Sequence, residues 1–186
     1  MSGWLIGLVV ILAIAGIMIV GFNKLRRLDI RAQEALGGID VQLTRRADLI
    51  PNLVATVKGY AAHESGVLEE VTAARAAVTA AAKAGSVADR ASAEAALDKS
   101  LVNVLAVAEA YPDLKASANF VALQQELSET EDQLAFARQY YNDATASLNT
   151  AVATFPWMLF SGMAAVHKRD FYEAPDAHQA PPQVAF

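Results

Sequence analysis

The first 22 residues of the chain carry no charged side chain, and from Trp4 to Phe22 the run WLIGLVVILAIAGIMIVGF is almost wholly apolar. A helix rises about 1.5 Å per residue, so roughly 20 residues cross a hydrocarbon core about 30 Å thick. The apolar run is therefore long enough to cross a bilayer as one helix. It predicts a transmembrane helix over residues 1–23.

A cleaved signal peptide is the alternative interpretation of this run, with Ala13-Ile14-Ala15 as a small-residue cleavage site. Two observations argue against it. No Lys or Arg precedes the run, and the apolar residues continue well past Ala15. We therefore expect the helix to be retained in the mature protein.

Basic residues follow the predicted span directly, whereas only the terminal amine precedes it. The positive-inside rule then predicts an N-terminus outside and the bulk of the chain in the cytoplasm. From residue 32 onward the chain has 11 basic and 19 acidic residues. The net negative charge of the chain argues against nucleic-acid binding, because contacts with phosphate need clustered Lys and Arg. The basic collar could fix the topology alone or also contact anionic lipids; its members are Lys24, Arg26, Arg27 and Arg31.

Apolar residues recur at steps of three and four from Leu25 to Ala61, which is the spacing of a helix packed in a bundle. This helix could continue directly from the membrane span. We expect Gly37-Gly38 to weaken it and Pro51 to kink it, because proline removes one backbone donor. A further apolar segment predicts that the same helix extends to near Ala82.

Gly85-Ser86 then predicts a turn, with Ser86 capping a helix over residues 87–111 that ends at Tyr111-Pro112. The longest seam runs from Phe120 to Phe155 without a break, and Pro156 ends it. No alternating pattern typical of a strand is present. The predicted fold is all-α: one transmembrane helix, then an antiparallel bundle of three to four long, coiled-coil-like helices over residues 24–172.

Two segments follow this seam. Residues 157–166 are apolar but too short to span a bilayer, so we expect them to pack on the bundle. The alternatives are that residues 157–166 lie in the membrane interface or pack against a neighbouring subunit. Residues 173–186 are rich in Pro and Ala, a composition that predicts disorder.

No catalytic or metal-binding motif emerges from the sequence. His63-Glu64 would need a second His at position 67 for a zinc-protease motif, and that residue is Val67. The absence of cysteine excludes thiolate metal sites and thiol catalysis. Glycine-rich phosphate loops, nucleophile elbows and inward Glu-x-x-His pairs are also missing. We therefore predict no catalytic residue, no metal, no cofactor and no enzyme activity.

Charged residues beside the two seams allow two interpretations. The default is a solvated face with helix ion pairs, each contributing about 0.2–0.5 kcal/mol. The alternative is an inter-helix network that fixes register, since an unpaired buried charge is costly. The residues concerned are Arg45, Arg46, Asp48, Glu109, Glu126, Glu131 and Arg138.

Several motifs in order resemble the LemA family of bacterial membrane proteins. They are RRADLIPNLVATVKGYAAHE (45–64), EAYPDLKA (109–116), F-x-x-L-Q-x-E-L (120–127), TEDQLAFARQYYN (130–142), and Asn149 with Phe155-Pro156. The resemblance implies a single-pass protein with an antiparallel helical bundle and no established enzyme activity. It also implies a set of structural positions: Arg46, Asp48, Pro51, Asn52, Glu109, Tyr111, Pro112, Glu131, Arg138, Tyr141 and Asn142.

Together these observations predict a non-enzymatic, membrane-anchored helical scaffold in the inner membrane of a bacterium. Its expected partners are the lipid bilayer, a second copy of the chain and another membrane protein. Gly3-x-x-x-Gly7 adds a weak signal for self-association. The alternative is an accessory or sensor subunit of a membrane protease or envelope-stress complex, with the region from Gly37-Gly38 to Pro51 as a flexible joint.

Overall fold

The computed structural model describes residues 3–61 and 63–173, and these residues form helices and connecting turns without a strand. Contacts divide them into two compact units. Unit 1 contains residues 3–36 and 140–171, and unit 2 contains residues 37–61, 63–139 and 172–173. The tail predicted for residues 173–186 lies, apart from Glu173, outside the described residues.

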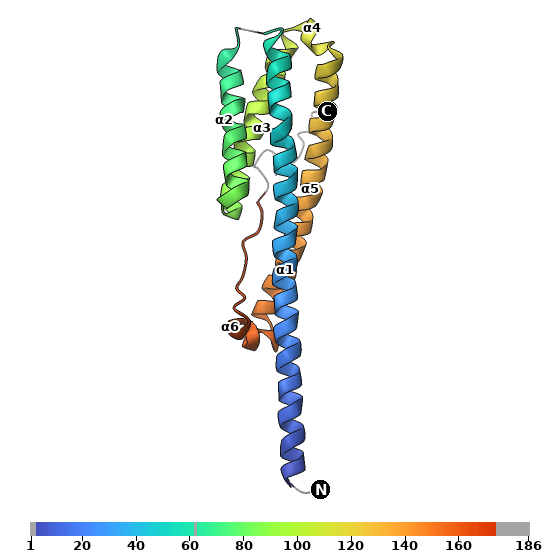
Figure 1. Ribbon diagram of the computed structural model, residues 1–186, viewed down its shortest axis with the longest axis vertical. Coiled ribbons are helices and arrows are strands. Elements are labelled where there is room, and N and C mark those ends of the chain that lie inside the picture. The colour runs from blue at the N-terminus through green and yellow to red at the C-terminus, as the bar shows by residue number, and fades with distance from the viewer. Residues whose placement is uncertain (1–2, 62, 174–186) are drawn as a thin grey trace, which may run out of the picture. The chain divides into compact units, whose positions relative to one another are not determined.

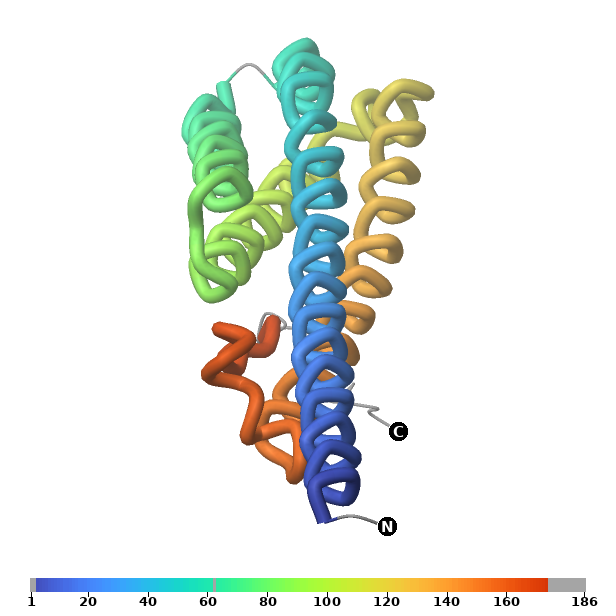
Figure 2. Tube along the Cα trace, turned by 60° about the horizontal axis from the view of Figure 1, so that its bottom comes forward, coloured from blue at the N-terminus to red at the C-terminus, as the bar shows by residue number. Residues whose placement is uncertain are grey.

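Long helices dominate both units, as the sequence predicts. In unit 2, consecutive long helices run in alternating directions, which confirms the antiparallel bundle (Figures 1 and 2). In chain order the elements are α1 (Gly3–Lys58), α2 (Ser65–Ala84), α3 (Val87–Glu109), α4 (Pro112–Lys115), α5 (Ala118–Ala153), the 3-10 helix η1 (Trp157–Phe160) and α6 (Ser161–Ala164).

The N-terminal part of α1 has the properties of a membrane span. Its most apolar 18-residue stretch has a mean hydropathy of 3.0, and only 6% of that stretch is buried. Large side chains such as Trp4 and Ile11 are 69% and 65% exposed. A core helix of a globular domain would bury such residues, so the exposed apolar surface fits a lipid environment better than water.

The helix α1 continues through Gly37-Gly38 and through Pro51, so neither position ends it. Pro51 has no N–H to donate to the carbonyl of Ala47, four residues earlier. In unit 2, Nε of Arg75 on α2 donates to this carbonyl at 2.9 Å. A side chain from the neighbouring helix thus satisfies the acceptor that proline leaves open, and the helix persists.

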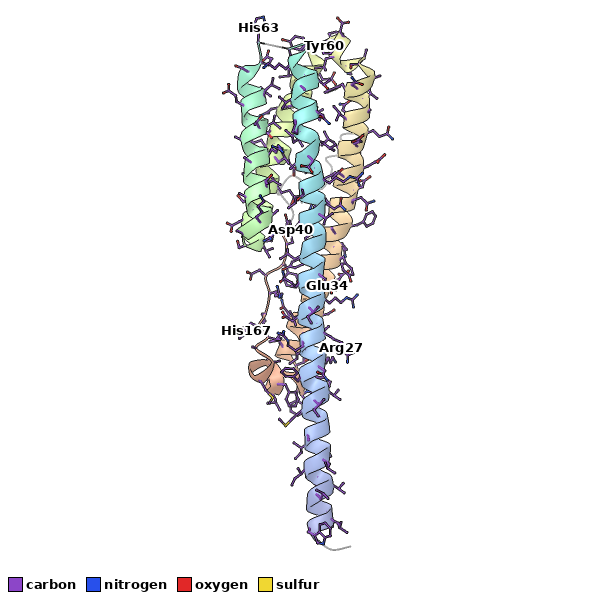
Figure 3. All side chains as sticks on the ribbon, in the orientation of Figure 1. Arg27, Glu34, Asp40, Tyr60, His63 and His167 are labelled. Carbon is purple, nitrogen blue, oxygen red and sulfur yellow. The ribbon has the colours of Figure 1, made fainter. Side chains whose placement is uncertain are left out.

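The predicted extension of this helix to Ala82 is wrong, because α1 ends at Lys58 and α2 starts at Ser65. The N–H groups of Tyr60 and Ala61 both donate hydrogen bonds to the carbonyl oxygen of Val57, with N···O distances of 3.0 and 2.8 Å. Glycine at position 59 is a poor helix former, which favours a turn at this point. Figure 3 shows Tyr60 and His63 at this end of unit 2.

The turn between α2 and α3 forms where the sequence predicts it. The Ser86 hydroxyl accepts a hydrogen bond from the Asp89 N–H at 3.1 Å, and the Asp89 carboxylate accepts one from the Ser86 N–H at 2.7 Å. This reciprocal capping box satisfies two donors that the first turn of a helix leaves free. It also lowers the pKa of Asp89, chiefly through the Ser86 backbone hydrogen bond.

Both predicted seams are largely buried and form the cores of the two units. Along α1 the buried residues are Leu25, Ala32, Leu36, Ile39, Leu43, Ile50, Leu53 and Val57. Along α5 they are Phe120, Leu123, Thr130, Leu134, Tyr141, Ala144, Leu148 and Ala151. Phe155 departs from the prediction, since α5 ends at Ala153 and the Phe155 side chain is 76% exposed.

Candidate functional site

Charged side chains from three helices of unit 2 meet inside its bundle. Arg46 on α1 places Nη1 2.5 Å from Oδ1 of Asp98 on α3 and 2.9 Å from Oε2 of Glu131 on α5. The Arg46 side chain is 9% exposed, against 19% for Asp98 and 27% for Glu131. One buried guanidinium therefore joins α1, α3 and α5.

A second arginine extends the series deeper into the same unit. Arg138 on α5 places Nη2 2.9 Å from Oε1 of Glu131 and also binds Glu94 on α3, whose side chain is fully buried. The hydroxyl of Tyr172 donates to the other oxygen of Glu94 at 2.6 Å. The result is a connected series of carboxylates and guanidinium groups that ends in a tyrosine hydroxyl, which we call the ion ladder: Asp98, Arg46, Glu131, Arg138, Glu94 and Tyr172.

Burial and neighbouring charges shift the pKa of four members of the ion ladder. Loss of hydration raises the pKa of Glu94, although the Tyr172 hydroxyl and Arg138 both favour the carboxylate. Burial likewise raises the pKa of Asp98 against the attraction of Arg46. Burial opposes the charge on Arg138, but Glu94 and Glu131 outweigh it and raise the pKa of Arg138. Burial and the Glu94 charge raise the pKa of the Tyr172 hydroxyl.

Another arginine joins α1 to the turn between α2 and α3 in the same unit. Arg90 donates to both carboxylate oxygens of Asp40, at 2.6 and 3.0 Å. It also donates to the backbone carbonyls of Gly85 and, at 3.1 Å, of Ala82. These carbonyls lie at the C-terminal end of α2, where a helix has no partners of its own. Figure 3 shows the position of Asp40 on α1.

A cleft of about 390 Å³ opens beside the outer end of the ion ladder, between α3 and α5. Arg46, Asp98 and Glu131 form its polar end. The remaining lining is mostly apolar and consists of Leu101, Val102, Leu105, Gln124, Leu127 and Ser128.

The ladder is suited to holding helices in register. Each of its three carboxylates contacts a guanidinium group, and each of the two guanidinium groups contacts two carboxylates. Removing Arg138 would leave the fully buried Glu94 without its cationic partner, at a cost of about 3–5 kcal/mol. In the described part of the chain, no three His, Asp or Glu side chains are grouped so as to hold a metal ion.

The structure brings together three of the residues that the sequence singles out. For Arg46, Glu131 and Arg138 the default interpretation of a solvated face is wrong, and the inter-helix network is what forms. The default holds for Arg45, Asp48, Glu109 and Glu126, which are exposed.

The other predicted structural positions are dispersed over unit 2. Pro51 and Asn52 are exposed on α1, and the carbonyl of Asn52 accepts the Thr56 hydroxyl at 2.8 Å. Tyr111 donates to Glu64 at 3.4 Å, Glu109 pairs with Lys115 at 2.5 Å, and Pro112 is the first residue of α4.

Two predicted positions lie on α5 in unit 1, where Asn142 is half-buried and Tyr141 is fully buried. The Tyr141 hydroxyl donates to the carbonyl of Asp170 at 2.8 Å. The Asn149 side chain makes two hydrogen bonds to the backbone of Arg169. Its NH2 group donates to the Arg169 carbonyl at 2.8 Å, and its side-chain oxygen accepts from the Arg169 N–H at 2.9 Å. These side chains hold the segment after α6 against α5.

The basic collar lies on α1 in unit 1, and its members are exposed. Lys24 lies over the Trp157 ring at 4.2 Å from the centroid. Arg26 is 3.7 Å from Asp29, and Arg31 donates to the Tyr140 hydroxyl at 3.3 Å.

Sequence reasoning missed half of the ion ladder, namely Glu94, Asp98 and Tyr172, and also Arg90. A signal for three of them is present, because positions 90, 94 and 98 are spaced four apart and share a helix face with Leu97 and Leu101. Charges that recur on an apolar face indicate buried ion pairs. Tyr172 follows the last helix and has no periodic signal.

Comparison with protein families matches residues 35–186, most of the chain, to the model described as the LemA family. The chain belongs to the LemA family. The match covers every residue of the ion ladder. It therefore confirms the resemblance that the motifs indicate.

Curated relatives of this LemA protein include Magnetosome protein MamQ 2 and MamQ 1 of Paramagnetospirillum magneticum. Each is 20% identical over 194 residues, covering 92% of this chain and 71% of the relative. Magnetosome protein MamQ of Magnetospirillum gryphiswaldense is 21% identical over 179 residues, covering 82% of this chain and 66% of the relative. Family membership and the apolar helix support a membrane-associated protein of LemA type.

Proposed function

We propose that this LemA protein is a non-enzymatic scaffold that is anchored in a bacterial inner membrane and self-associates through its helices. The observation that carries the proposal is the continuity of α1. This single helix of 56 residues includes both the apolar run and a central part of the unit 2 core. A membrane span joined to the bundle by an unbroken helix tethers the bundle without a separate linker.

The outer faces of unit 2 supply the expected docking surface. Val41 on α1, Val102 on α3 and Phe136 on α5 are 63%, 64% and 71% exposed. Exposed apolar side chains of this size favour contact with a second copy or with a membrane-protein partner. The charges of the ion ladder are paired inside the bundle, which supports a structural role for them rather than a catalytic one.

Two experiments on the full-length protein test self-association. Light scattering measures its mass in mild detergent, and chemical cross-linking detects oligomers in native membranes. We expect an oligomer in both experiments. Phe136→Ser and Val102→Ser should shift it toward monomer, whereas the matched control Lys99→Ser, on an exposed polar position of α3, should not. A monomer in both experiments would contradict the scaffold proposal.

An accessory or sensor subunit of a membrane protease or envelope-stress complex is the second candidate. It is favoured by the position of the division between the units, which lies at Gly37 within α1. Two adjacent glycines make a helix easier to bend, because each costs about 1 kcal/mol relative to alanine. Cross-linking in cells should then capture a different set of partners after Pro51→Ala or Gly38→Ala, and an unchanged set would contradict this candidate.

A further inference from the structure

A short apolar segment of unit 1, residues 155–163, has one buried and one exposed face. Phe160 is 9% exposed, whereas Phe155, Leu159, Met163 and Met158 are 76%, 64%, 56% and 48% exposed. The segment includes η1 and the start of α6. Large apolar side chains grouped within nine residues indicate an interaction surface.

Packing on α1 fixes the level of this segment along the helix. A Cβ at Gly21 would lie 2.5 Å from Cδ2 of Phe160, so the ring rests directly on the glycine backbone. Gly21 belongs to the last turn of the uncharged run, and the first charged residue is Lys24. If α1 spans the membrane, the segment therefore lies where hydrocarbon gives way to headgroups.

The charges around the segment match an anionic lipid surface. Lys24 lies over the Trp157 ring. Trp and Tyr are the aromatic residues that are enriched at membrane–water interfaces. Val20, Asn23, Lys24, Arg27 and Leu28 line a hollow of about 420 Å³ on α1. No acidic residue occurs between Asp143 and Asp170, so negative headgroups would meet no like charge from this stretch.

We infer that residues 155–163 form an interfacial anchor, a second membrane contact that lies in the headgroup region of an anionic lipid surface. The four exposed apolar side chains enter the boundary of the acyl chains, and Lys24 and Arg27 bind lipid phosphates. This inference rests on the proposed membrane span of α1.

The chain contains no cysteine, so a single introduced cysteine carries a unique label. Full-length Leu159→Cys, Ile11→Cys and Val121→Cys are each labelled with an environment-sensitive fluorophore and reconstituted into vesicles of phosphatidylcholine and phosphatidylglycerol. Ile11 reports on the span, and Val121, 50% exposed on α5 in unit 2, is the matched control for an exposed apolar position. Aqueous iodide and lipids brominated near the headgroup end of the acyl chain serve as quenchers.

We expect the label at position 159 to be quenched several-fold more by the brominated lipid than the label at position 121. The effect should weaken in pure phosphatidylcholine and in a Lys24→Gln, Arg27→Gln background. Iodide quenching at 159 equal to that at 121, with position 11 in lipid, would overturn the anchor and leave the span intact. Shielding of 159 from both quenchers would place a protein partner there and also overturn the anchor. Iodide access at position 11 would instead overturn the membrane span itself.

Discussion

Arg75 on α2 donates a hydrogen bond from Nε to the backbone carbonyl of Ala47 on α1, at 2.9 Å. Ala47 lies four residues before Pro51, so this carbonyl is the one that proline deprives of its helical donor. The contact lets a proline persist inside a long helix, and it ties α2 to α1 at that point. It also makes the two positions energetically dependent on each other.

A double-mutant cycle tests this dependence. Arg75→Ala should destabilise the protein by about 1–3 kcal/mol, because the Ala47 carbonyl loses its donor. In a Pro51→Ala background, the new backbone N–H at position 51 replaces that donor, so the same change should cost less. Thermal unfolding followed by circular dichroism in detergent measures both effects. Arg45→Ala, at an exposed position on α1, is the control, and equal costs in the two backgrounds would exclude the coupling.

The hydrogen bond from Tyr172 to Glu94 should stabilise the bundle of unit 2. Tyr172→Phe removes one donor from a fully buried carboxylate, and hydrogen bonds to charged groups contribute about 1.5–3 kcal/mol. We expect a loss of stability in this range in denaturant or thermal unfolding. Tyr60→Phe, whose side chain is 46% exposed, should change little. A Tyr172→Phe variant with unchanged stability would show that Tyr172 is not part of the ion ladder and that the ladder ends at Glu94.

The ion ladder should also make stability depend on pH. Burial raises the pKa of Glu94 above its ordinary value of 4.5 in the folded state. The folded protein then binds more protons than the unfolded chain in the window that begins near pH 4.5, so the contribution of Glu94 to stability falls as pH rises through this window. Glu94→Gln removes this titration.

Unfolding midpoints of the wild type and of Glu94→Gln across this window provide the test. The midpoint of the wild type minus that of the variant should become smaller as pH rises. A difference that grows with pH would mean that Arg138 and Tyr172 outweigh burial and lower the pKa of Glu94.

Alanine at Gly38 should stabilise α1. A Cβ at this position meets no atom within 4 Å, and alanine in a helix is more stable than glycine by about 0.5–1 kcal/mol. We expect a higher unfolding midpoint for Gly38→Ala. Gly85→Ala should have the opposite effect, because a Cβ there would lie 2.7 Å from the carbonyl oxygen of Ala81. Unfolding midpoints that shift in the same direction for Gly38→Ala and Gly85→Ala would contradict this explanation.

The orientation that the positive-inside rule predicts is tested with a tag after Phe186. If the N-terminus lies outside, as the basic residues after the span predict, protease should reach the tag only after lysis of spheroplasts. A cytoplasmic protein serves as the control for intact membranes. Cleavage in intact spheroplasts would instead place the bundle on the envelope side.

Local sequence patterns predict the all-α class, the apolar helix, the turn at Gly85-Ser86 and most of the buried seam residues. These features depend on local chemistry and helical periodicity. Steps of three and four place Leu25 to Val57 on one face of α1, and the capping box forms between residues three apart. Motifs in a fixed order also identified the LemA family, which the family comparison confirmed.

The packing of the helices against one another determines where the charges lie and how α1 continues through its proline. Arg46 and Arg45 are adjacent in the sequence, yet one is buried between two carboxylates and the other is exposed. Arg138 and Glu94 are 44 residues apart, and Arg75 and Ala47 are 28 apart. Whether a charge on a helix faces water or a partner depends on which neighbouring helix packs there and in what register. Periodicity within one helix carries no information about that choice.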